Sequence, residues 1–162
     1  MSAGAIVLAA GASTRYGGVK QRDLLPAVLE TLLQTSVDPI VVVEGAHPIA
    51  DLVPAGIAVV RCRDWERGPG ASLRAGLAAM GSGVTRALVV LADGPDLDPR
   101  AVERVLESHA PAAAAAYDGA RSHPVALERS VWASIPDAGA RALDVELVDC
   151  SDLRPPGDVD VR

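Results

Sequence analysis

The sequence predicts an α/β fold, with three layers (α/β/α) built on a mainly parallel, doubly wound sheet. Short apolar runs alternate with segments of helical periodicity along the 162 residues. The runs are continuously apolar rather than alternating, as expected of strands that helices cover on both faces. No linker rich in Pro or Gly divides the chain, so we expect a single domain over residues 1–162.

The expected strands and helices alternate along the chain. The strands are expected at residues 5–10, 39–43, 57–61, 87–92, 112–117 and 145–150, the fifth being an alanine-rich run. The helices are expected at residues 24–35, 72–80 and 99–109. In a sheet of this kind ligands bind outside the carboxyl ends of the strands. The segments that follow the strands are therefore the places to look for a site.

Composition narrows the class of protein. Apolar residues make up 49% of the chain, but there is no Phe and only two Trp and two Tyr, so Val, Leu, Ile and Ala must form the core. The net charge of −6 argues against a general nucleic-acid binder, and any positive potential has to be local. Cys62 and Cys150 lack metal-ligand spacing and are expected to be free thiols in a reducing compartment.

The amino-terminal residues do not have the pattern of a targeting segment. No basic stretch precedes the first apolar run, and no run reaches the ~18 apolar residues of a membrane span. We therefore expect neither a signal peptide nor membrane association, and a cytoplasmic location.

Residues 8–20, LAAGASTRYGGVK, carry the strongest indication of function. They follow an apolar run and combine three glycines with small hydroxyl residues and two cations, Arg15 and Lys20. Glycines let the backbone come close to a bulky anion, and exposed N–H groups in such a loop form an anion-binding nest. Arg15 offers a planar fork to phosphate oxygens, and Lys20 a mobile charge. This combination suits a polyphosphate, although the residues alone also allow a solvated turn with incidental charges.

The spacing fits neither GxGxxG nor GxxxxGK[ST], but the loop resembles the LA[AG]GxSxRxGxxK signature of the MobA-like nucleotidyltransferases. The matching residues are Leu8, Ala9, Gly11, Ser13, Arg15, Gly17 and Lys20. The resemblance implies a nucleotide-diphospho-sugar transferase-like fold and transfer of a nucleotidyl group. It implies nucleotide binding by Leu8, Ala9, Ala10, Gly11, Ser13, Arg15 and Lys20, with Arg15 and Lys20 also catalytic.

A carboxylate follows the expected strand 87–92. Asp93, in LADGP, ends a buried strand just before a Gly-Pro turn. Mg²⁺ prefers one or two carboxylates together with phosphate oxygens and water, so this is a suitable place for it. Taken alone, such an Asp is more often a cap or turn residue. The resemblance implies that Asp93 binds Mg²⁺ and is catalytic, with Gly94 standing where the family's LADQP variant has Gln.

Two further segments resemble the molybdenum-cofactor cytidylyltransferase branch of this family. In residues 64–77 a glycine-rich turn is expected to lead into a helix whose N-terminus lies near Ser72, which caps it or binds a nucleotide base. Residues 121–127 resemble a loop that faces the second substrate, and the resemblance makes His123 the acceptor-binding residue. His123 is equally compatible with a buried structural role.

The last residues include two more candidate metal ligands. Asp158 and Asp160 resemble the start of the family's D-[IV]-D-T-P-E-D box, whose continuation is absent here. On a strand these two side chains would point to opposite faces, so only one is expected to reach the metal. Residues 159–162 are expected to be a frayed end.

The resemblance implies Mg²⁺-dependent attack of an acceptor phosphate on the α-phosphorus of an NTP, with release of pyrophosphate. The Ala-Ala-Gly variant at residues 9–11 favours CTP, with GTP possible, and molybdopterin as the acceptor. A sugar phosphate, an alditol phosphate or phospholactate are the alternative acceptors. A molybdoenzyme or maturation factor is a possible protein partner, and a non-catalytic cofactor-binding relative is the alternative from another class.

Overall fold

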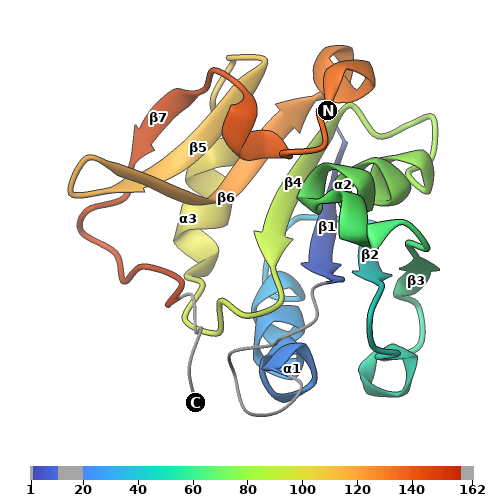
Figure 1. Cartoon of the computed structure of the whole chain (residues 1–162). Coiled ribbons are helices and arrows are strands. Elements are labelled where there is room, and N and C mark those ends of the chain that lie inside the picture. Colours follow the sequence, from blue (N-terminus) through green and yellow to red (C-terminus); the bar gives the residue numbers. More distant parts are fainter. Residues whose placement is uncertain (1, 11–19, 158–162) are drawn as a thin grey trace.

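The computed structural model describes residues 2–10 and 20–157 and has the three-layer α/β/α architecture predicted (Figure 1). Its described strands form one sheet in the order β3-β2-β1-β4-β6-β5-β7. The strands are β1 (Ala3–Ala9), β2 (Ile40–Glu44), β3 (Ala58–Arg61), β4 (Arg86–Leu91), β5 (Ala112–Tyr117), β6 (Ala120–Glu128) and β7 (Glu146–Asp149).

The sheet is mixed but mostly parallel, as expected. β1 pairs in parallel with β2 and β4, β2 with β3, and β5 with β7. Only β6 is antiparallel to its neighbours, β4 and β5, among the strands of the described residues. The other strands therefore share one direction, and their carboxyl ends meet at one edge of the sheet. In Figure 1 the arrowheads of β1, β2 and β4 mark this edge.

The prediction of a loop at residues 121–127 is wrong, because these residues belong to β6. The β5–β6 connection is a tight turn with positive φ at both Asp118 (53°) and Gly119 (80°), the pattern of Asp-Gly hairpins. Pro124, which argues against a strand, lies outside the residues that pair β6 with β4, and at a register shift opposite β5. Its missing N–H therefore costs the sheet no hydrogen bond.

The described residues form three α-helices, which lie on the two faces of the sheet, and their bounds differ from the prediction by a few residues. They are α1 (Lys20–Leu32), α2 (Pro69–Ala78) and α3 (Pro99–Leu106). Between β6 and β7 the chain adds two short 3-10 helices, η3 (Arg129–Ser134) and η4 (Ala140–Ala142).

Two apolar clusters hold the layers together, one on each face. On one face, α1 and α3 pack on alternate strand residues such as Val7 and Val42. On the other face, α2 and the chain after β6 pack on the intervening residues, including Ile6 and Val41. The alternation follows from the period of two along a strand. Both faces of the central strands are therefore buried, as their continuous apolar runs predict.

Replacing Leu88 by Ala should destabilise the fold, because this fully buried side chain of β4 would leave a cavity in the core. We expect a loss of about 2–5 kcal/mol in the free energy of unfolding, measured by urea denaturation. The matched control is Leu33→Ala, at a side chain that is 60% exposed and should change stability by less than about 0.5 kcal/mol. Equal losses in the two variants would contradict this account of the core.

Candidate functional site

The loops that follow β1 and β2 meet the η2 turn (Trp65–Arg67) at the carboxyl edge of the sheet. A Cβ added to Gly45 would lie 2.8 Å from the Cβ atoms of both Ala10 and Trp65, so a larger residue does not fit there. The N–H of Ala46 donates to the carbonyl of Ala10 over 3.2 Å and joins the first two loops. These segments, far apart in sequence, therefore form one surface.

The predicted phosphate-binding loop begins and ends at this edge. At its start β1 ends with Leu8 half-buried and Ala9 buried, followed by a buried Ala10. Lys20 is the first residue of α1. Gly11, Ser13 and Arg15 lie outside the described residues, as does the side chain of Lys20. Their assignment to the nucleotide stays a prediction.

A pocket of about 450 Å³ opens beside Ala10 and is lined by Gly45, Arg61, Cys62, Arg63 and Trp65. We call it the arginine–tryptophan pocket. Arg61 and Arg63 are exposed, and the ring of Trp65 is half-buried. An indole flanked by guanidinium groups can stack on a planar base and attract a phosphate.

The N-terminus of α2 lies next to this pocket, but the protein itself covers it. The helix begins at Pro69, with Gly68 before it at a φ of 128°, so the expected start near Ser72 is wrong. The N–H of Gly70 donates to the carbonyl of Asp137 over 2.9 Å. A Cβ on Gly70 would lie only 1.7 Å from the Pro136 carbonyl oxygen.

Ser72 lies inside the helix and is only 3% exposed, so it does not cap the N-terminus. The carboxylate of Asp137 also binds Arg74, at 2.6 Å, and thereby holds the covering segment in place. Proline at the first helical position explains the earlier start, since it needs no acceptor there. Contact of Ser72 with a nucleotide stays a prediction.

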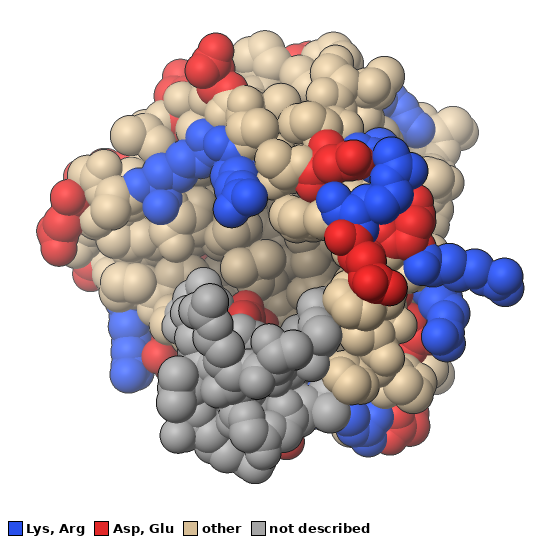
Figure 2. All heavy atoms as spheres, in the orientation of Figure 1, with Lys and Arg blue, Asp and Glu red and all other residues tan. Residues whose placement is uncertain are grey.

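A second pocket, of about 520 Å³, lies on the other side of β1. We call it the β4–β6 pocket, because its walls come from the end of β4, the turn after it and the first half of β6. Residues 140–141 and 155–157 complete the walls. Figure 2 shows this face of the molecule hollowed at its centre, with Lys and Arg side chains gathered above the hollow.

Asp93 and His123 are brought together at this pocket. Asp93 lies two residues after the end of β4 and is half-buried, and His123 lines the pocket from β6. Burial lowers the pKa of His123 to about 4; the charge of Arg121 acts in the same direction, and that of Asp93 opposes it. The imidazole is therefore neutral near pH 7 and can donate one hydrogen bond. Its predicted role in binding an acceptor is untested, but it lies beside Asp93.

Residues 150–157, which we call the C-terminal strap, pack against the turn that carries Asp93. The N–H of Asp96 donates to the carbonyl of Pro156 over 2.8 Å. A Cβ on Gly94 would lie 3.1 Å from Pro156 Cβ, and one on Gly157 would lie 2.8 Å from Asp96 Oδ2. The strap therefore takes up space beside Gly94, where the family's variant has a longer side chain. Asp158 and Asp160 follow it and lie outside the described residues.

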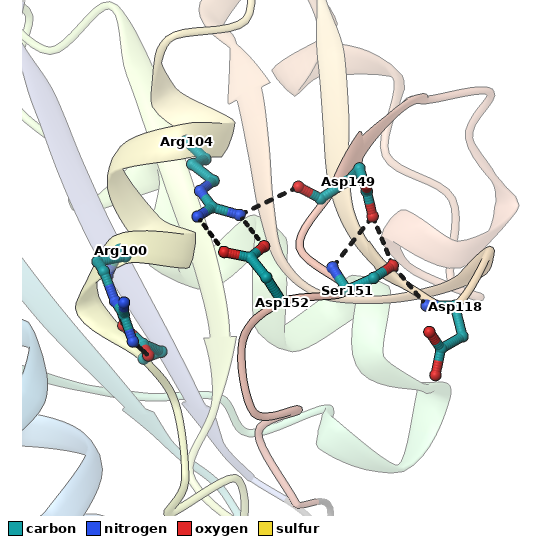
Figure 3. A network of polar contacts seen from close by, with 7 residues as sticks. Arg100, Arg104, Asp118, Asp149, Ser151 and Asp152 are labelled. Carbon is teal, nitrogen blue, oxygen red and sulfur yellow. Dashed lines mark hydrogen bonds and ion pairs between the residues drawn. The ribbon is translucent and has the colours of Figure 1, made fainter.

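A polar network anchors the start of the strap (Figure 3). Arg104 of α3 binds both carboxylate oxygens of Asp152, at 2.6 and 2.8 Å, and the carbonyl of Asp149 at 3.3 Å. The hydroxyl of Ser151 donates to the carboxylate of Asp149. It also accepts from the N–H of Asp118 over 2.9 Å, which joins the strap to the β5–β6 turn.

The described residues contain no group of three or more His, Cys, Asp or Glu side chains that could hold a metal ion. Asp93, just after β4, could offer a carboxylate to a metal at this edge. That donor set suits a hard cation that completes its coordination with phosphate oxygens and water.

The model of the MobA-like NTP transferase domain matches residues 5–147. The chain belongs to this family. It is a nucleotidyltransferase, in agreement with the loop signature at residues 8–20 and the position of Asp93. Comparison with curated proteins gives no match. Among residues 2–10 and 20–157, none of the helices has the length and hydropathy that a membrane span requires.

Solved structures share this fold. Rv0371c from Mycobacterium tuberculosis H37Rv is 26% identical, with a TM-score of 0.82 over 99% of this chain and 94% of that chain. Its complex with manganese aligns at 23% identity and a TM-score of 0.75, over 92% and 88% of the two chains. A CMP:2-keto-3-deoxy-manno-octonic acid synthetase complexed with CTP is 14% identical, with a TM-score of 0.78 over 99% and 94%. The nucleotide-diphospho-sugar transferase-like fold is thus confirmed.

Removing the anchor of the strap should have a pH-dependent effect. The guanidinium of Arg104 lowers the pKa of Asp152 from 3.8 to about 2. The pKa of Asp152 is lower in the folded protein than in the unfolded chain. The ion pair therefore makes its full contribution to the free energy of unfolding above about pH 4, and this contribution disappears as the pH falls through 2. Asp152→Asn should therefore lower the urea midpoint at pH 6, and the difference from wild type should vanish towards pH 2.

The control for this experiment is Asp144→Asn, at an exposed carboxylate that has no ion pair in the described part of the chain. It removes the same charge and should shift the urea midpoint little at either pH. A difference between wild type and Asp152→Asn that does not depend on pH would contradict the role given to the ion pair.

Proposed function

We propose that the protein catalyses Mg²⁺-dependent transfer of CMP from CTP to a phosphorylated small molecule, with release of pyrophosphate. One observation carries the proposal: the two pockets flank the end of β1, where the signature loop begins, and Asp93 lies in the turn between Leu91 and Gly94, which line the second pocket. A nucleotide on one side and an acceptor on the other would meet at the loop.

The arginine–tryptophan pocket suits the nucleoside. The ring of Trp65 offers a stacking surface, and Arg61 and Arg63 add positive charge. From there the triphosphate would run onto the loop at residues 11–18, where Arg15 and Lys20 neutralise it. The close approach of Ala10 and Trp65 to Gly45 supports this path, because it joins pocket and loop.

Mg²⁺ would be held by Asp93, with Asp158 or Asp160 as a second carboxylate. The contacts of Gly94 and Gly157 support this choice, since they bring the chain just before Asp158 against the turn of Asp93. Mg²⁺ uses one or two carboxylates and completes its coordination with phosphate oxygens. When bound, the ion supplies positive charge that neutralises the triphosphate.

The reaction itself makes few demands on the protein. An oxygen of the acceptor phosphate attacks the α-phosphorus in line; a P–O bond forms, and the bond to the departing pyrophosphate breaks. The acceptor phosphate is already ionised, so no general base is needed. The protein's part is to orient the two substrates and to neutralise charge. The neutral His123 would donate a hydrogen bond to the acceptor.

The acceptor would occupy the β4–β6 pocket. Among acceptors, we propose molybdopterin first, because the apolar side chains of Val90, Leu91, Leu97 and Val125 suit a ring system. In that case a molybdoenzyme or a maturation factor would receive the product. A sugar phosphate, an alditol phosphate or phospholactate would use the same chemistry.

CTP should be used at least ten-fold better than GTP, a preference of about 1.4 kcal/mol. The physical reason is the methyl group of Ala10, which packs against Gly45 beside the nucleoside pocket and leaves less room for a purine. The measurement is pyrophosphate release with each NTP, Mg²⁺ and a panel of phosphorylated acceptors. In Ala10→Gly the ratio of the rates with CTP and with GTP should be smaller than in the wild type.

A preference for GTP or ATP would refute this steric argument and move the chain to another branch of the family. Binding of NTPs without turnover on any acceptor would instead favour a non-catalytic, cofactor-binding role. A thermal-shift titration of each NTP with and without Mg²⁺ separates binding from turnover.

Asp93→Asn should lower Mg²⁺-dependent pyrophosphate release at least 100-fold, which corresponds to about 2.7 kcal/mol in the barrier. The substitution is nearly isosteric, so the melting temperature should change little. Asp38→Asn, at an exposed residue just before β2 on the opposite edge of the sheet, is the matched control and should keep wild-type rates. Turnover by Asp93→Asn at ordinary Mg²⁺ concentrations would show that the metal lies elsewhere.

A further inference from the structure

We infer that the acceptor carries a second anionic group besides the reacting phosphate, and that Arg141 binds this group. The inference rests on the proposed function, because it assigns the β4–β6 pocket to the acceptor. It concerns the wall of that pocket to which residues 140–141 belong.

Arg121 holds this wall in place through hydrogen bonds to neutral groups. Its guanidinium donates to the carbonyls of Leu143 over 2.8 Å and of Ala140 over 2.5 Å. Both acceptors are neutral, and no carboxylate pairs with Arg121 in the described part of the chain. Arg121 therefore ties η4 to the start of β6 and leaves a positive charge at the pocket.

Arg141 lies between those two anchor points and also lines the pocket. It is exposed, and it makes no hydrogen bond or ion pair within residues 2–10 and 20–157. By contrast, Arg100 pairs with Asp98, Arg104 with Asp152, and Arg154 with Asp96. The unpaired Arg141 is thus free to bind a ligand.

The balance of charge in the pocket points to an anion. Its described lining includes Arg121 and Arg141 but no Asp or Glu; His123 is neutral and adds no charge, and Asp93 lies in the turn between the lining residues Leu91 and Gly94. The chain as a whole has a net charge of −6, so this local excess of positive charge runs against the overall composition. A ligand that reaches the pocket would supply the missing negative charge.

The reacting phosphate does not fill this role. It has to lie at the end of β4, near Asp93, where it can reach the α-phosphorus of the nucleotide. Arg141 comes from η4, which forms a different wall of the pocket. A guanidinium binds a carboxylate or a phosphate through two parallel hydrogen bonds, so either could be the second group. Among the proposed acceptors phospholactate carries such a carboxylate, whereas molybdopterin has neither group beyond its reacting phosphate. A second anionic group would therefore favour phospholactate over molybdopterin as the acceptor.

The test compares three probes by isothermal titration calorimetry. Ethyl phosphate has one anionic group, 2-phosphoglycolate adds a carboxylate, and 1,2-ethanediol bisphosphate adds a second phosphate. The wild type should bind at least one of the two-group probes about ten-fold more tightly than ethyl phosphate. The tighter of the two identifies the second group as a carboxylate or a phosphate.

The variants assign the effect to Arg141. In Arg141→Gln the ten-fold difference should shrink to two-fold or less, while the affinity for ethyl phosphate stays the same. Arg141→Lys keeps the charge but loses the fork, and should retain part of the difference. Arg100→Gln removes an equal charge from the exposed surface of α3, outside the pocket, and should bind all three probes as the wild type does.

Three results would overturn the inference: no measurable binding of the probes, equal binding of all three by the wild type, or an unchanged difference in Arg141→Gln. None of them depends on turnover. Titration of CTP into the same proteins tests the proposed function separately from the role of Arg141. If the wild type does not bind CTP, that result contradicts the proposed function and not the binding of an anion by Arg141. Arg141→Gln should bind CTP as the wild type does.

Discussion

The parallel pairing of β1 with β2 and β4 is the constraint on which the site depends. The two ladders hold Leu8 beside Val43 on one side and beside Leu91 on the other. Because the strands run the same way and in this register, their carboxyl ends finish together. Every segment with a proposed role in nucleotide binding or catalysis then starts from one edge. Burial of both faces fixes the register, since a slip by one residue would turn apolar side chains outward or onto the wrong layer.

The reversed strand β6 gives this edge its second pocket. A parallel strand beside β4 would present its carboxyl end here, whereas antiparallel β6 presents its first residues, including Arg121 and His123. The same reversal directs the chain after β6 back over the sheet, where residues 129–143 cover the face that α2 leaves open. One change of strand direction thus supplies both a cationic wall and a helical layer.

The C-terminal strap shows how distant segments complete the pocket. Its start is bound to α3 by Arg104 and its end to the turn of Asp93 through Pro156. Neither attachment is visible in the spacing of motifs, because Arg104 and Asp152 are 48 residues apart in the sequence and Asp96 and Pro156 are 60 apart. The anchored strap also explains how glycine at position 94 suits this chain, where the family's LADQP variant has Gln.

The sequence by itself determined the layer architecture, most strands, the family and the signature loop, because continuous apolar runs and close-range motifs are local. It also contained the Asp118-Gly119 pair that is typical of a hairpin turn, but Pro124 argues against a strand, so β6 was not predicted. Only the tertiary structure decided that Asp137 covers the N-terminus of α2 and that Arg141 faces a pocket without a carboxylate partner in the described chain. Such pairings depend on which distant backbone atoms meet, and sequence spacing does not encode that.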